Sequence, residues 1–178
     1  MVERYTSETV LITSGGRIPD FERLMELHQR RIVGVALRLT GNIADAEDAA
    51  QEVFVRLHRN LNSLPDAASV LPWLHRVTVN VCLDQKRRTR TVPIEGLALV
   101  CASADPESAA ASRETGEHLQ MALLNLGERE RAALVLRDLE GLSTAEVAAT
   151  LGSTESTVRV QIARARLKLR ELLKGVRR

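Results

Sequence analysis

The chain has 178 residues and a net charge of only +2, so its length allows one large domain or two small ones. Aromatic residues make up 2% of the sequence. A core must therefore be built from Leu, Val, Ile and Ala, a composition that favours helices over a sheet. No apolar run approaches the length of about 20 residues that spans a bilayer, and the N-terminus lacks the pattern of a secretion signal. We therefore expect an all-α cytoplasmic protein.

Two cysteines, Cys82 and Cys101, are too few for a disulfide framework. Cys82 lies within a helical pattern, where we expect it to pack as a small apolar residue, and a redox switch between the two thiols is the weaker interpretation. The four His residues are far apart, and no Cys cluster accompanies them. We therefore expect neither a metal site nor a cofactor.

The first 19 residues show no hydrophobic periodicity and are expected to form a mobile tail. Asp20 can cap a first helix that ends at Gly41 and is apolar on more than one side, as a central helix of a bundle would be. A second helix begins near Ile43. Its apolar residues form one stripe, at Ala46, Ala49, Ala50, Val53, Phe54 and Leu57.

The opposite face of this second helix carries acids and an amide, followed by bases. Acids in the first turns and bases in the last turns suit the helix dipole, which is a sufficient structural explanation. So dense an acidic face could equally dock a basic partner. The residues alone do not favour either of these two interpretations. The polar face consists of Asp45, Glu47, Asp48, Gln51, Glu52, Arg56 and Arg59.

Residues 60–72 contain two Asn and two Pro, which predict an irregular loop. A third helix is expected from Trp73 to about Arg88, with Leu74, Val77 and Val81 inward. Its expected outward residues include His75, Arg76 and Asn80. Four bases fall within the five residues 86–90, which is more than helix capping needs, and this cluster favours a phosphate-binding face.

Between residues 91 and 114 the sequence turns rich in Ala, Ser and Pro, which predicts a linker. From Thr91 to Glu117 five acids stand against the single base Arg113, so this segment is not expected to bind DNA. It can separate two basic modules or mimic nucleic acid in a basic channel. Helices are then expected to resume near Ser112 and to continue from Glu128 to about Leu139.

A helix-turn-helix is predicted after residue 140. Ser143 and Glu146 form a capping box for a short helix that Gly152 ends. The second helix can be capped by Ser153 or Thr154. Its inward stripe recurs at steps of four and three, through Val158, Ile162, Ala165, Leu169 and Leu172.

The exposed face of this second helix is basic. From residue 154 to residue 178 there are eight Lys or Arg against two Glu, and small hydroxyl residues flank the turn. A charge run is usually a solvated face. The hydroxyls and the local excess of positive charge nevertheless favour a helix that enters the major groove of DNA.

Three segments, in this order, resemble the extracytoplasmic-function type of the sigma-70 family. Residues 45–56 resemble its core-binding helix. Residues 73–84 with the basic tail at 86–88 resemble its promoter-proximal helix, and residues 126–173 resemble its C-terminal helix-turn-helix. The resemblance implies two small helical domains, region 2 at 20–90 and region 4 at 115–178, joined by an acidic linker at 91–114. It implies a transcription initiation factor that is not an enzyme, and whose partners are core RNA polymerase and promoter DNA.

The resemblance also assigns roles to residues. Core polymerase would be bound by Asp45, Asp48, Gln51, Glu52, Phe54 and Arg56. The −10 element, with one base flipped out of the duplex, would be bound by Asn62, Ser63, Arg76, Asn80, Lys86, Arg87 and Arg88. The −35 element would be bound by Ser143, Thr144, Thr154, Thr157, Arg159, Val160, Ala163, Arg164, Arg166 and Lys168.

Two features of the sequence depart from the family pattern. The residues before Trp73 are more apolar than is common there, and Val160 and Ala163 are small and apolar, which suits thymine methyl groups. The linker is expected to follow the RNA-exit path of the polymerase. Because the chain contains no sensor of its own, we expect an anti-sigma protein to hold it inactive.

Two other classes of protein compete with this interpretation. A dimeric helix-turn-helix regulator would explain the C-terminal half but would leave the acidic helix and the basic 73–90 helix without a purpose. An enzyme would need a nucleophile with its base, a phosphate-binding glycine loop or a ligand cluster, and the sequence contains none of these motifs.

Overall fold

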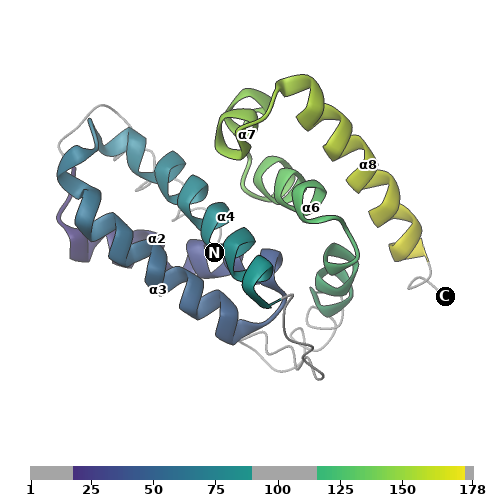
Figure 1. Ribbon diagram of the computed structural model, residues 1–178, viewed down its shortest axis with the longest axis horizontal. Coiled ribbons are helices and arrows are strands. Elements are labelled where there is room, and N and C mark those ends of the chain that lie inside the picture. The colour runs from purple at the N-terminus through teal and green to yellow at the C-terminus, as the bar shows by residue number, and fades with distance from the viewer. Residues whose placement is uncertain (1–17, 90–115, 175–178) are drawn as a thin grey trace, which may run out of the picture.

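The computed structural model describes residues 18–89 and 116–174 (Figure 1). Within these two ranges the chain forms helices and turns, arranged as an N-terminal and a C-terminal helical domain side by side. The all-α class and the two-domain architecture are thus confirmed. The predicted tail (apart from its last two residues), the acidic linker and Cys101 lie outside the described residues, as does the side chain of Arg88.

The N-terminal domain is built from α2 (Phe21–Thr40), α3 (Ile43–Asn60) and α4 (Val70–Thr89). Asp20 caps α2 by accepting a hydrogen bond from the Arg23 amide at 3.0 Å, and Gly41 ends it with a φ of 98°, where a side chain would be strained. Every residue of the predicted α3 stripe is buried, as is Cys82. The prediction of an aliphatic core is therefore confirmed in this domain.

The predicted loop before α4 is shorter than expected. Short turns of 3-10 helix, η1 (Leu61–Ser63) and η2 (Ala67–Ser69), occupy much of it. Asp66 caps η2 through the Ser69 amide at 2.9 Å, and α4 then begins at Val70 rather than Trp73. Pro72 fits because it lies in the first turn, where a helix needs no hydrogen bond from its amide.

The side chain of His75 is buried, with 1% of its surface exposed, and the expectation that it faces outward was wrong. It lies on the side of α4 that meets α2 and the C-terminal domain, near His28 of α2. Burial, together with the charges of Arg31 and His75, lowers the pKa of His28 to about 4. His28 is therefore neutral in the folded protein at neutral pH.

The C-terminal domain begins with a described helix at residues 116–124 and continues with α6 (Glu128–Leu134), α7 (Thr144–Leu151) and α8 (Glu155–Lys174). The predicted helix to Leu139 ends instead in a wide π turn, η3 (Val135–Leu139), closed by the Glu140 amide donating to the Val135 carbonyl at 3.0 Å. The capping box at Ser143 and the left-handed Gly152 are both present. The helix-turn-helix is confirmed.

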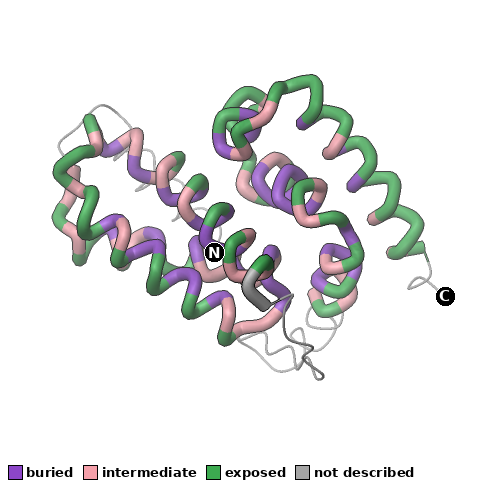
Figure 2. The backbone as a smooth tube through the Cα atoms, in the orientation of Figure 1, coloured by how far each residue is buried: buried purple, intermediate pink, exposed green. Residues whose placement is uncertain are grey.

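The buried stripe of α8 is shorter than predicted. Val158, Ile162 and Ala165 are buried and Leu169 is half-buried, but 41% of Leu172 is exposed. Figure 2 shows that the last turns of α8 are largely exposed. Leu173, next to Leu172, instead lines a pocket with Leu119 and Leu123 of the helix at 116–124. The apolar stripe predicts which side of the helix a residue lies on. Whether that residue is buried depends on a neighbouring element that packs against the same turn of the helix.

Arg131 of α6 joins the two domains. Its guanidinium, in a residue only 4% exposed, donates to the carbonyls of Leu123 (2.8 Å), Leu124 (2.8 Å) and Leu126 (3.0 Å) in its own domain, and to that of Leu39 in α2 (2.6 Å). These carbonyls lie at or just beyond helix ends, where intrahelical donors run out. Arg131 therefore donates to four carbonyls at helix ends, one of which, that of Leu123, also accepts from the Leu126 amide at 3.0 Å.

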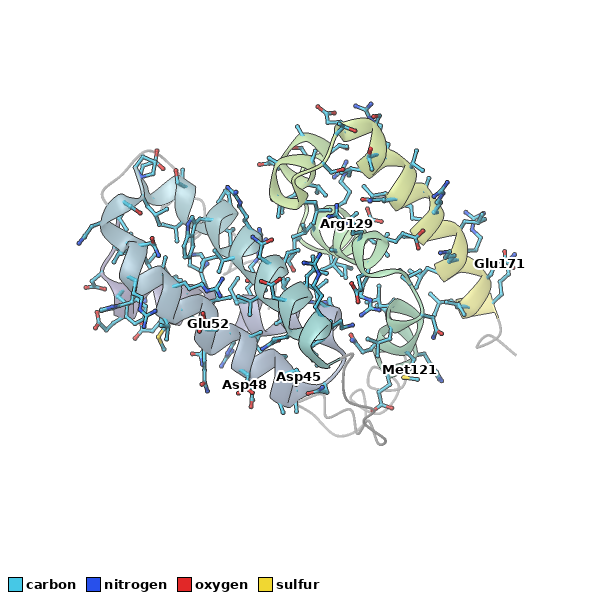
Figure 3. The ribbon with its side chains drawn as sticks, in the orientation of Figure 1. Asp45, Asp48, Glu52, Met121, Arg129 and Glu171 are labelled. Atoms are coloured by element: carbon cyan, nitrogen blue, oxygen red, sulfur yellow. The ribbon has the colours of Figure 1, made fainter. Side chains whose placement is uncertain are left out.

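We expect Arg131→Met to lower the free energy of unfolding by about 3 kcal/mol or more, because it leaves several buried carbonyls unsatisfied. Urea unfolding followed by circular dichroism measures this. Arg129→Met is the matched control, since Arg129 is exposed on the same helix (Figure 3), and it should change stability by less than about 0.5 kcal/mol. Equal losses in the two variants would contradict the role of Arg131.

The buried neutral His28 predicts a pH effect on stability. The unfolded state binds a proton at His28 below its ordinary pKa of 6.5, whereas the folded state does so only near pH 4. The free energy of unfolding should therefore fall as the pH drops through this window, by up to about 3 kcal/mol from this group. Urea unfolding of wild type and His28→Leu at several pH values isolates the contribution. If the free energy of unfolding changes with pH in the same way in both proteins, His28 is not the source of the pH dependence.

Candidate nucleic-acid and partner interfaces

The second helix of the helix-turn-helix, α8, is oriented by its buried side. Thr154 caps it by accepting from the Thr157 amide at 3.2 Å, and Val158, Ile162 and Ala165 pack toward α6 and α7. The opposite side of α8 is exposed along its length and faces away from the N-terminal domain (Figures 1 and 2). Nine of the ten predicted −35 residues are exposed, and Thr144 alone is half-buried.

The bases of α8 fall into two groups by their contacts. Arg166 makes a bidentate pair with Asp138 (2.8 and 2.6 Å), and Lys168 lies 2.7 Å from Glu130, so both point along the side of the domain that carries α6 and η3. Arg159 pairs with Glu155 one turn earlier, at 2.7 Å. Exposed pairs of this kind contribute about 0–1 kcal/mol. These side chains can therefore exchange their carboxylate for a phosphate or a base at little cost.

The front of α8 also exposes an apolar residue. Val160 is 48% exposed, and Ala163 lies three residues further along the same exposed face. An exposed valine next to Arg159 and Arg164 gives a surface that can combine hydrogen bonds to guanine with contacts to thymine methyl groups.

The predicted −10 residues are divided between the surface and the interior. Asn62 and Ser63 are exposed on η1, and Arg76, Asn80 and Arg87 are exposed on α4. Lys86 differs: it is half-buried, and burial together with the charge of Arg131 lowers its pKa to about 8. The structure thus brings five of the seven residues to the surface, places Lys86 partly inside, and does not describe the side chain of Arg88.

A cleft of about 550 Å³ lies beside these residues and was not predicted from the sequence. The half-buried Trp73 and the exposed Arg76 line it from α4, Leu64 lines it from the preceding loop, and Glu146 and Thr150 line it from α7. The signal in the sequence was Trp73, the single Trp in a chain that is 2% aromatic. An aromatic ring next to an arginine suits stacking of an unpaired base.

The acidic face of α3 is exposed at Asp48, Gln51 and Glu52, with Glu52 held 2.7 Å from Arg56 one turn later. Figure 3 shows the labelled acids along the outer edge of α3. Asp45 is half-buried, and its amide donates to the Asn42 cap at 2.7 Å, so it belongs partly to the helix start. Phe54 is only 6% exposed and packs in the core.

An apolar groove of about 730 Å³ runs beside this acidic face, between α2 and α3. Phe21, Met25 and Val33 line it from α2, and Val55, which is 42% exposed, lines it from α3. Sequence reasoning missed these residues. The available signal was Val55, an apolar residue that lies outside the α3 stripe and one turn after Gln51.

The described parts of the chain contain no group of three or more His, Cys, Asp or Glu residues that could hold a metal ion. None of the helices described is both long and apolar enough to cross a lipid bilayer.

Comparison with known families gives two matches that follow the two domains. The sigma-70 region 2 family matches residues 24–92, and a sigma-70 region 4 family matches residues 117–169. Together they cover most of the chain, in the order expected from the sequence.

Two curated relatives are both ECF RNA polymerase sigma factors. The chain is 37% identical to the ECF RNA polymerase sigma factor SigM of Mycobacterium tuberculosis, over 96% of this chain and 86% of SigM. It is 38% identical to the ECF RNA polymerase sigma factor SigE of Mycolicibacterium smegmatis, over 88% of this chain, and spans 62% of that longer protein.

Solved structures agree with the sequence relatives. The sigma factor RpoE of Bartonella quintana, in complex with the anti-sigma factor NepR, superimposes with a TM-score of 0.73 at 26% identity, over 89% of this chain and 99% of RpoE. CnrH, in complex with the cytosolic domain of CnrY, gives a TM-score of 0.63 at 25% identity, over 87% of this chain and 88% of CnrH. The chain therefore belongs to the extracytoplasmic-function sigma factors of the sigma-70 family, which initiate transcription and are not enzymes.

Proposed function

We propose that this chain binds core RNA polymerase and directs it to promoters by reading a −35 and a −10 element. The observation that carries the proposal is the presence, in one chain, of three separate exposed surfaces: the recognition face of α8, the polar face of α4, and the acidic face of α3. A protein that only bound an operator would need the first of these surfaces and not the other two.

The −35 element is read by α8 in the major groove, where a recognition helix presents its N-terminal half to base edges. Arg159 and Arg164 are suited to guanine, and Val160 and Ala163 to thymine methyl groups. Arg166 and Lys168 bind the phosphate backbone after leaving their carboxylate partners. Ser143, Thr144, Thr154 and Thr157 add hydroxyl donors near the starts of α7 and α8.

The −10 element is bound by α4 and by the turns before it. One base leaves the stack, which costs a few kcal/mol, and a protein pocket for that base offsets the cost. Asn62, Ser63 and Asn80 supply hydrogen bonds to the base, and Trp73 supplies a stacking surface. Arg76, Lys86, Arg87 and Arg88 hold phosphates.

Core polymerase is bound by α3. Asp48, Gln51 and Glu52 face a basic surface of the polymerase, with Asp45 and Arg56 at the margins. The neighbouring apolar groove between α2 and α3 adds contact area, and Phe54 forms part of its floor. Charged residues give such an interface its specificity, while buried apolar area gives much of its affinity.

Regulation by an anti-sigma protein belongs to the same proposal, with the chain acting in the cytoplasm. Of the solved structures that it resembles, one is the sigma factor RpoE in complex with the anti-sigma factor NepR, and another is CnrH in complex with the cytosolic domain of CnrY. In this proposal the boundaries are region 2 at 20–90, the linker at 91–114 and region 4 at 115–178.

We expect Arg159→Ala to weaken binding to a −35 duplex about tenfold or more, because a bidentate contact to guanine contributes about 1–3 kcal/mol. Arg170→Ala is the matched control, an exposed arginine near the other end of α8 that we assign no base contact. Fluorescence anisotropy with a labelled duplex measures both. Equal weakening would mean that α8 binds DNA by charge alone.

The double variant Asp48→Arg with Glu52→Arg should abolish binding to core polymerase, because it places two positive charges opposite a basic partner. Its binding to the −35 duplex should not change. The control reverses two exposed acids outside α3, as Glu117→Arg with Glu171→Arg. Pull-down of core polymerase gives the result, and loss of binding in both variants would make the effect one of net charge.

Run-off transcription on a pool of DNA fragments tests the whole proposal. Core RNA polymerase with the chain should produce defined transcripts that core alone does not, and their start sites give the promoter elements by alignment. If the chain binds duplex DNA but never changes the transcripts, the dimeric regulator is the better explanation.

A further inference from the structure

The apolar groove between α2 and α3 follows the two helices along their length. One wall is a stripe of α2 residues at steps of four, which extends over about 18 Å of helix and consists of Phe21, Met25, Gln29 and Val33. The start of α2 lies against the end of α3, where the Phe21 and His58 rings meet edge to face with their centroids 5.0 Å apart. The rim that α3 provides therefore carries Arg59 at this end and Glu47 at the other.

The groove exposes apolar surface that the described residues leave uncovered. Val55 is 42% exposed, and Phe21, Met25 and Val33 are half-buried. Contiguous apolar surface with a polar rim marks a place where another segment or molecule binds. Because the rim carries charges of both signs, it suits an occupant that is apolar and has little net charge.

The 17 residues before Ile18 lie outside the described residues, and their sequence supplies such an occupant. Their longest apolar run is Val10-Leu11-Ile12, and Gly15 and Gly16 separate this run from Ile18. Ile18 precedes Phe21 by three residues, so the chain enters the domain beside one end of the groove. Adjacent glycines let a chain reverse its direction, because they adopt a positive φ without strain. The apolar run can therefore be brought back along α2.

The length and the charge of this segment also fit the groove. Six peptide units join Ile12 to Ile18 and can span up to roughly 20 Å, which is close to the length of the α2 stripe. A tether this short gives the apolar run an effective concentration in the millimolar range, so a weak intrinsic affinity is enough for substantial occupancy. The side chains of residues 1–17 include two acids and two bases, so neither end of the rim repels the segment as a whole.

We propose that Val10-Leu11-Ile12 occupies the groove between α2 and α3 in the free protein, and that core polymerase has to displace it. The competition rests on the proposed function, in which the groove adds contact area for the polymerase, whereas the docking itself does not. The apparent affinity for the polymerase is then the intrinsic affinity multiplied by the fraction of molecules with an empty groove. A groove filled in roughly 70–90% of molecules weakens polymerase binding about three- to tenfold.

Disulfide trapping on the full chain tests the docking. Leu11→Cys is paired with Val55→Cys in the groove or, as the matched control, with Glu52→Cys, which is also exposed on α3 but does not line the groove. The background is Cys101→Ser, and Cys82 can stay because burial raises the pKa of its thiol to about 12 and keeps it unreactive. In a glutathione buffer the groove pair should show an effective concentration at least about tenfold higher than the control pair.

Two changes within the segment test the competition. Leu11→Ser with Ile12→Ser should strengthen binding of core polymerase about three- to tenfold, because the groove is then empty in most molecules. Leu11→Ile with Ile12→Leu is the matched control, since it keeps the apolar volume and should bind the polymerase as the wild type does. Both variants should bind the −35 duplex with unchanged affinity, because α8 is not involved.

The outcomes distinguish the steps of the proposal. Equal effective concentrations in the two disulfide pairs would overturn the docking. Trapping that depends on protein concentration would assign the groove to a second copy of the chain and would overturn it as well. A preferred groove disulfide together with unchanged polymerase affinity in the serine variant would overturn the competition. If the groove disulfide is preferred but neither wild type nor variant binds core polymerase, the proposed function fails and the docking stands.

Discussion

The guanidinium of Arg131 is the interaction on which the arrangement of helices depends. Helix ends leave carbonyl groups short of intrahelical donors. Three carbonyls at or just beyond a helix end of the C-terminal domain converge on this one side chain, together with one from α2. An arginine can serve all four because its donors are fixed in one plane and it stays charged even when buried. Hydrophobic packing alone would allow these helix ends to slide, whereas four hydrogen bonds to one planar group fix their positions.

Charge in this protein is divided by domain and by face rather than spread evenly. A net charge of +2 hides an acidic face on α3 and a basic face on α8. On α8 several bases already have carboxylate neighbours, in Glu155, Asp138 and Glu130. Such exposed pairs add little stability. The carboxylates do, however, reduce the positive electrostatic potential around α8 when no DNA is bound. Non-specific attraction to phosphates is therefore weaker, and contacts to bases contribute a larger share of the binding energy.

Local features of the fold were predictable because their causes are local. Caps at Asp20 and Ser143, the stop at Gly152 and the α3 stripe depend on residues within a few positions of each other, and the structure confirms them. The burial of His75 was not predictable, because it depends on Glu140 and the C-terminal domain, far away in sequence. The exposure of Leu172 and the grooves beside Trp73 and Val55 depend in the same way on which elements lie alongside. The residues assigned to each interface stay predictions, since exposure permits binding without identifying the partner.

The π turn at η3 connects these observations. An α-helical continuation through Val135–Leu139 would close hydrogen bonds four residues apart, but here the Glu140 amide reaches back five residues, to Val135. The wider turn rotates Glu140 relative to the buried face of α6, and Gly141, with a φ of 77°, then allows the chain to turn sharply into the Ser143 cap. Only Gly141 and Leu142 therefore separate Glu140, which contacts Arg31 of the N-terminal domain, from Ser143, which caps the first helix of the helix-turn-helix.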